Sequence, residues 1–205
     1  MDSKYSGAIA TAILIFAGCS HVAQSGFISG YNQLQRGKHL EKVLASQDFV
    51  KGKGIAIEIR KPISQGVQNN EEFPLKEAQN YLFEVLQRNL ATEPGIHIIS
   101  TGTEKSSLGE RYLVLETAIT RLDPGSRAMR WFASELGAGH SKVQVEGKLV
   151  DPHSGKLLIQ FADSRAGSAM GGLDITGGSG REMLQADLNG IAKALGETLA
   201  ELPTA

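Results

Sequence analysis

An apolar run near the start of the chain constrains the rest most strongly. It extends from Ala8 to Ala17 and is followed by Gly18 and Cys19, the only cysteine in the sequence. Lys4 and the N-terminal amine make the preceding residues positive. The run is shorter than the about 20 apolar residues that a membrane-spanning helix needs. A positive start, a short apolar run and small final residues together indicate a secretory signal.

The end of this run resembles the lipobox of bacterial lipoproteins. Ala17 and Gly18 match its two small positions, and Cys19 matches the residue that carries the lipid. Phe16 departs from the pattern, because leucine is preferred at its position. The resemblance implies cleavage before Cys19, three acyl chains (palmitate among them) on the mature cysteine, and sorting to the outer membrane because Ser20 rather than aspartate follows. The alternative is an uncleaved N-terminal helix in which the cysteine is a small buried side chain.

The signal divides the chain into three predicted parts. Residues 1–18 are a lipoprotein signal peptide, residues 19–50 a lipidated N-terminus and tether, and residues 51–205 a single periplasmic domain. Without a second cysteine the domain forms no internal disulfide, so its stability depends on an apolar core. The net charge of −1 gives no basic excess, so we expect no nucleic-acid partner.

The predicted tether is polar and rich in glycine, with a few isolated apolar side chains. Its Ser25-Gly26-Phe27 step, followed by Tyr31 and Leu34, resembles the start of a poorly characterised family of outer-membrane lipoproteins. We expect these residues to pin the tether to the domain, and the alternative is a partner-binding peptide. Residues 39–50 are expected to form a weak helix or an irregular bridge.

Apolar periodicity predicts a strand–helix–strand unit after the tether. Alternating isoleucines predict a strand over 55–60, which Pro62 ends because proline donates no ladder hydrogen bond. A single apolar stripe predicts a helix over 74–92, and residues 96–99 form a second short strand. A right-handed crossover joins such strands, so the pair is expected to be parallel. The stripe consists of Leu75, Ala78, Leu82, Leu86 and Leu90.

The second half of the chain predicts antiparallel strands and a final helix. Residues 111–121 form a long strand, 142–150 and 156–163 a hairpin with a Pro- and Gly-containing turn, and 181–202 a helix. The predicted fold class is therefore α+β, a mixed sheet of about five strands with two main helices on one face and a short helical insert over 126–136. One side of the sheet is more polar and is expected to face water or a partner.

A second stretch resembles uncharacterised envelope lipoproteins. Residues 123–158 contain a Pro-Gly-Ser-Arg step, a Gly-x-Gly, and a strand that ends in an Asp…Gly-Lys turn. The order of the predicted elements is also similar to that of the periplasmic domain of the curli-secretion channel lipoprotein. That likeness concerns the fold and carries no function by itself.

No motif in the sequence indicates catalysis or metal binding. The five histidines lack the i,i+4 spacing of metal ligands, and lipidation of Cys19 removes the thiolate. The glycine-rich segments 137–142 and 154–157 lead into strands rather than helices, so they are predicted to be turns and not phosphate loops. No Gly-x-Ser-x-Gly elbow occurs. We therefore expect no enzyme activity, no cofactor and no metal.

The stretch most suited to an interaction is the predicted insert. Its candidate residues are Arg127, Arg130, Trp131 and Phe132, since tryptophan and arginine are enriched at interface anchors. Alternatively, the two aromatic residues cap the core or contact the membrane interface. The predicted function is an outer-membrane-anchored periplasmic lipoprotein that acts as a structural or interaction component of an envelope assembly, docking onto envelope proteins or onto itself. The alternative is a carrier that holds a lipid or small molecule between the sheet and the C-terminal helix.

Overall fold

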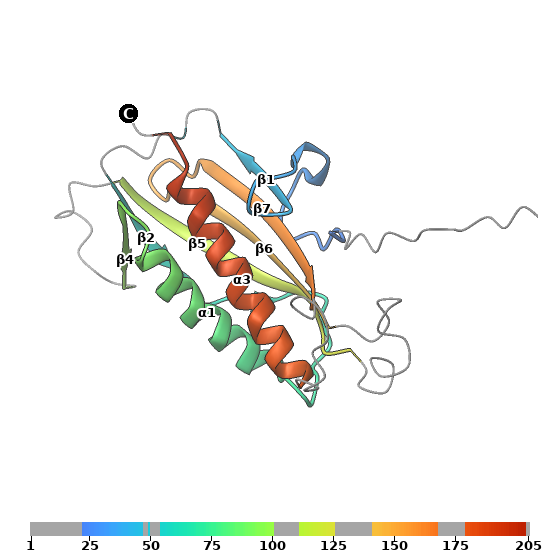
Figure 1. Ribbon diagram of the computed structural model, residues 1–205. Coiled ribbons are helices and arrows are strands. Elements are labelled where there is room, and N and C mark those ends of the chain that lie inside the picture. The colour runs from blue at the N-terminus through green and yellow to red at the C-terminus, as the bar shows by residue number, and fades with distance from the viewer. Residues whose placement is uncertain are drawn as a thin grey trace, which may run out of the picture.

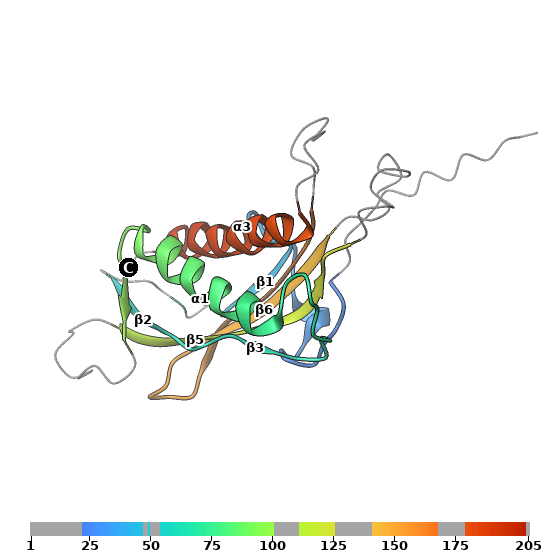
Figure 2. The same ribbon diagram turned by 90° about the horizontal axis from the view of Figure 1, so that it is seen from below.

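Seven strands form one mixed sheet, and two helices cover one of its faces (Figures 1 and 2). The computed structural model describes residues 22–46, 49, 54–100, 111–125, 141–167 and 179–203. The elements in chain order are η1 (Tyr31–Gln33), β1 (Lys42–Ala45), β2 (Ile55–Ile59), β3 (Ile63–Ser64), α1 (Leu75–Ala91), β4 (Ile96–Ile99), β5 (Arg111–Asp123), β6 (Lys142–Val150), β7 (Leu157–Ala166) and α3 (Gly180–Ala200).

The sheet order is β1-β7-β6-β5-β2-β4, and β3 pairs with β5 beyond the end of β2. β2 runs parallel to both β4 and β5, which confirms the predicted crossover through α1. β5, β6, β7 and β1 are joined by antiparallel pairings. The predicted α+β class and the two helices on one face are confirmed, while the sheet has two more strands than expected.

The main core lies between the sheet and the two helices. α3 begins with a capping box, in which Ser179 accepts from the Glu182 backbone N–H and the Glu182 side chain accepts from the Ser179 N–H. Both helices bury their leucine stripes, and Asn189 of α3 accepts from Asn89 of α1 at 3.1 Å. Where β6 and β7 face this core, the Phe161 ring fills the space beside Gly147, and a Cβ there would lie 2.2 Å from the ring. Within the described segments, neither helix has the length and apolarity needed to cross a bilayer.

The two additional strands lie in segments where the sequence predicts no strand. Residues 39–50 were expected to form a weak helix or a bridge, whereas Lys42–Ala45 is an edge strand antiparallel to β7. The prediction of a helix was wrong because four residues are too few to show a period, and pairing with β7 decides the conformation. The strand Ile63–Ser64, which lies between the predicted strand 55–60 and the predicted helix 74–92, similarly exists through its pairing with β5.

Candidate functional site: the outer face of the sheet

The face of the sheet opposite the helices carries polar side chains that are nevertheless buried. Strand alternation places Val143 and Val145 of β6 in the core and turns Gln144 and Glu146 to the outer face. Gln160 of β7 lies on the same face. The exposed fractions of Gln144, Glu146 and Gln160 are only 1%, 0% and 6%. Residues 22–36, here called the N-terminal strap, cover them.

The strap is held partly by apolar packing. Ile28 and Leu34 are buried against Ala162 of β7, and together they form a cluster separate from the main core. Half-buried side chains complete this cluster: Val22, Phe27, Tyr31 and Leu44. The expectation that Phe27, Tyr31 and Leu34 pin this segment to the domain agrees with these contacts.

Gln144 fixes the start of the strap by pairing with its backbone. The Ala23 N–H donates to Gln144 Oε1 at 2.8 Å, and Gln144 Nε2 donates to the Ala23 carbonyl at 2.7 Å. The same amide nitrogen lies 3.0 Å from Thr120 Oγ1. The side-chain amide of Gln144 thus takes the place of a neighbouring strand, because it pairs with both the backbone N–H and the carbonyl of Ala23.

Glu146 is the centre of the strap contacts. Its carboxyl group accepts from Ser25 Oγ at 2.8 Å, from the Tyr31 hydroxyl, and from Gln144 Nε2 at 2.8 Å. Burial, together with the hydrogen bond to Glu146, raises the pKa of Tyr31 above its usual range. Gln65, from the segment after β3, donates to the Ser25 carbonyl at 2.9 Å. The strap and β6, which lie far apart in the sequence, therefore meet at one buried carboxyl group, and Gln65 holds the strap from a third segment.

Further along the strap, the contacts become looser and leave a shallow depression. The Ser29 N–H donates to Gln160 Oε1 at 3.1 Å, and Lys148 Nζ lies 5.0 Å from the centre of the Phe27 ring. Lys148 also pairs with Glu116 at 3.2 Å. These side chains, with Val150, border a depression of about 300 Å³ that is open to solvent.

The carrier alternative requires an empty space between the sheet and α3. That space is filled by core side chains that are at most 1% exposed: Leu184, Leu188, Ile191, Leu195 and Leu199.

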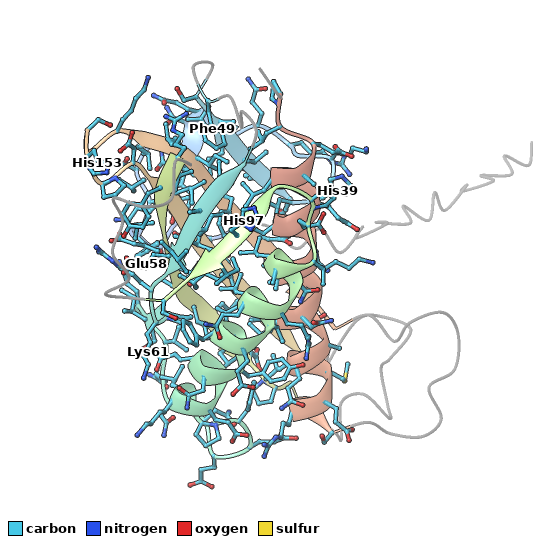
Figure 3. The ribbon with its side chains drawn as sticks, turned by 90° about the vertical axis from the view of Figure 1, so that its left-hand side faces the viewer. His39, Phe49, Glu58, Lys61, His97 and His153 are labelled. Atoms are coloured by element: carbon cyan, nitrogen blue, oxygen red, sulfur yellow. The ribbon has the colours of Figure 1, made fainter. Side chains whose placement is uncertain are left out.

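Another group of ionisable side chains on the outer face lies near the β6–β7 turn. The Tyr112 hydroxyl donates to the buried carboxyl group of Glu58, and the His153 ring meets the Tyr112 ring edge-on at 6.3 Å between centroids. Figure 3 shows His39, His97 and His153 apart from one another, with His97 on β4, His39 beside α3 and His153 in the β6–β7 turn. In the described part of the chain, no three histidine, cysteine, aspartate or glutamate residues come together as a metal site.

A second polar cluster lies on the helix side of the sheet. Asp187 of α3 and Asp163 of β7 are 9% and 4% exposed, and Arg165 donates to Asp163 at 3.0 Å. Ser141 Oγ lies 3.5 Å from Asp187 Oδ2. Burial raises the pKa of Asp187 to about 6, against the opposing effects of Arg165 and Ser141. This cluster joins the start of α3 to the β6–β7 pair and is separate from the strap.

The residues that the sequence singles out lie outside the described residues. These are Cys19, Arg127, Arg130, Trp131 and Phe132. The sequence did not identify Gln144, Glu146 and Gln160, because polar residues at alternate strand positions are also typical of a solvent-facing strand. The available signal was the set of isolated apolar residues in the strap, which need a surface to pack on.

Comparison with known proteins places this chain in a family. The family model described as a domain of unknown function, DUF4410, matches residues 48–171. The chain belongs to the DUF4410 family. The matched region covers β2 to β7, including Gln144, Glu146 and Gln160, and ends before α3. No curated protein matches the sequence significantly.

Several solved bacterial proteins are similar to this DUF4410 protein in fold. A PelC variant from Paraburkholderia phytofirmans, described as a dodecamer, is 17% identical, with 78% of this chain and 97% of that chain covered and a TM-score of 0.48. The hypothetical protein CT253 from Chlamydia trachomatis is 12% identical, with coverage of 72% and 98% and a TM-score of 0.49. Lipoprotein GNA1162 from Neisseria meningitidis is 12% identical, with coverage of 67% and 97% and a TM-score of 0.35. At these values the likenesses carry no statement about function.

Proposed function

We propose that this DUF4410 protein is a lipoprotein of the outer membrane, whose periplasmic domain acts as a structural or interaction component of an envelope assembly. The observation that carries the proposal is the apolar run that ends at Ala17, Gly18 and the single Cys19. Lipidation of Cys19 gives the domain a permanent place at a membrane. Ser20 after the cysteine favours the outer membrane by the resemblance to sorted lipoproteins.

A role in assembly, without catalysis, is supported by how the outer face uses its polar groups. Gln144, Glu146 and Gln160 would be the natural candidates for a buried polar site. Each of them hydrogen-bonds the protein's own strap instead, at Ala23, Ser25, Tyr31 or Ser29. Groups that fix a segment in place contribute rigidity, which suits a module that presents a surface to partners.

The partners that this proposal includes are other envelope proteins, with a homo-oligomer as one form of the assembly. The proposal includes the likeness in element order between this chain and the periplasmic domain of the curli-secretion channel lipoprotein. That likeness is an analogy of fold and carries no function by itself. The docking region would be the segment with Arg127, Arg130, Trp131 and Phe132, because buried aromatic and arginine side chains contribute most of the binding energy at interfaces.

The experiment compares assembly of soluble protein, produced without the signal and lipid, with that of a Trp131→Ala, Phe132→Ala double variant. Native mass spectrometry and pull-down from envelope extract are expected to show that wild type forms a complex that the double variant loses. Ile63→Ala is the matched control, since Ile63 is a large apolar side chain that is 49% exposed and lies outside the proposed docking segment in the sequence. An unchanged monomer with unchanged partners in all three proteins would contradict the role of this segment.

A further inference from the structure

The strap leaves almost no free chain between the lipidated cysteine and the folded domain. Residues 19–50 are predicted to be a tether, yet Ala23 is already held by Gln144 through two hydrogen bonds. Ala23 follows Cys19 by four residues. A fully extended chain spans about 3.6 Å per residue, so the Ala23 backbone lies within about 14 Å of Cys19.

We infer that the end of the sheet where β5 ends and β6 begins is held against the phospholipid bilayer. This inference rests on the proposed lipidation of Cys19. The acyl chains enter the hydrocarbon layer and keep the Cys19 backbone at the headgroups. Ala23, its partner Gln144, and Thr120, to which Gln144 also donates, are then within one short spacer of the membrane surface.

The side chains at this end fit a headgroup layer. Arg121 of β5 pairs in register with Gln144 and therefore shares its outer face, and Lys142 lies two residues before Gln144 on the same face. Both side chains are half-buried at their strands and carry positive charge. Anionic headgroups attract basic residues near a bilayer surface, so these two residues complement a membrane that contains phosphatidylglycerol.

The opposite end of the β6–β7 hairpin is held away from the bilayer. β6 has nine residues from Lys142 to Val150, and the turn that contains Ser154 follows. At about 3.3 Å per residue, that strand separates the two ends by about 27 Å. Figure 1 shows β5, β6 and β7 running side by side along the length of the domain. The domain therefore stands on one end of its sheet and presents the hairpin turn to the periplasm.

Energy transfer to the membrane tests this orientation. Full-length lipidated protein is labelled with a donor at Asp123→Cys or Ser154→Cys, both of which are exposed positions. Acylation blocks the thiol of Cys19, so each variant has a single reactive cysteine. The protein is placed in vesicles of phosphatidylethanolamine and phosphatidylglycerol that contain a headgroup acceptor. Because of the about 27 Å of strand between the positions, we expect transfer from position 123 to be about twofold or more above that from position 154.

A matched variant with a longer spacer tests whether the short chain between Cys19 and Ala23 causes the difference in energy transfer. Insertion of about 12 Gly and Ser residues between His21 and Val22 adds about 20 Å of flexible chain and leaves the strap intact. It is expected to lower transfer from position 123 towards the value at 154. Equal transfer from the two positions in lipidated protein, or no effect of the spacer, would overturn the inference and leave the lipoprotein proposal standing. If the full-length protein isolated from cells instead carried no acyl groups and did not float with vesicles, this would contradict the lipoprotein proposal, and this inference with it.

Discussion

Replacement of Glu146 by alanine is expected to lower the free energy of unfolding by about 3 kcal/mol and to release the strap, since buried donors without acceptors are costly. The variant would leave the Tyr31 hydroxyl, Ser25 Oγ and Gln144 Nε2 without the carboxyl group that accepts from them. Glu146 is fully buried, so water cannot replace it without the strap moving. The measurements are urea denaturation and hydrogen exchange of the Ala23 and Ser29 amides.

Glu116→Ala is the matched control for this prediction. Glu116 is a glutamate on the same face of the sheet, but it is 28% exposed at the side chain and pairs with Lys148 and Arg60 near solvent. Surface ion pairs of this kind contribute between about 0 and 1 kcal/mol, so we expect a small loss and no change in strap exchange. Equal losses in the two variants, or protected Ala23 and Ser29 amides in the Glu146→Ala variant, would show that Glu146 does not hold the strap.

Asp187→Asn is expected to stabilise the protein at pH 7.5 and to flatten its dependence on pH. Burial raises the pKa of Asp187 from 3.8 to about 6 in the folded state. Between these values the native protein binds a proton that the unfolded chain has released, so stability falls as pH rises through this window. A rise in pKa of about two corresponds to about 3 kcal/mol. This is the upper limit of the increase in the free energy of unfolding that Asp187→Asn can give at pH 7.5.

The measurement is the free energy of unfolding in urea at intervals from pH 4 to pH 8. Wild type should lose stability up to about pH 6 and then level, and the difference between the variant and wild type should grow over the same interval. Glu84→Gln, which removes an exposed carboxylate from α1, is the control and should shift the whole curve by less than about 0.5 kcal/mol. A constant difference between the Asp187→Asn variant and wild type across the range would mean that Asp187 ionises normally in the folded protein.

Most of the fold could be predicted because its elements are long and strongly periodic. The alternating isoleucines of β2 and the leucine stripe of α1 place both elements to within one residue of their observed ends. β4 and β6 have the predicted bounds. β1 and β3 could not be predicted in the same way, since strands of four and two residues have no period and exist through pairing with β7 and β5.

The polar contacts under the strap were harder to predict, because the same sequence pattern fits either a solvent-facing strand or a strand covered by another segment. Gln144 and Glu146 alternate with core valines, which is the pattern of a strand with one face in water. Only the structure shows that residues 22–36 lie over them. Phe27 and Tyr31 were correctly expected to pin this segment, but the surface that receives them is about 120 residues away in the sequence, as between Ser25 and Glu146.

The mass of the N-terminal peptide of the mature protein tests the central claim most directly. Trypsin cleaves after Arg36, and no lysine or arginine lies between Cys19 and that residue, so a lipoprotein would yield one peptide over residues 19–36. We expect that this peptide, from protein isolated with the outer membrane, begins at Cys19 and carries three acyl chains. A peptide that extends upstream of Cys19, or one that begins at an unmodified cysteine, would contradict it.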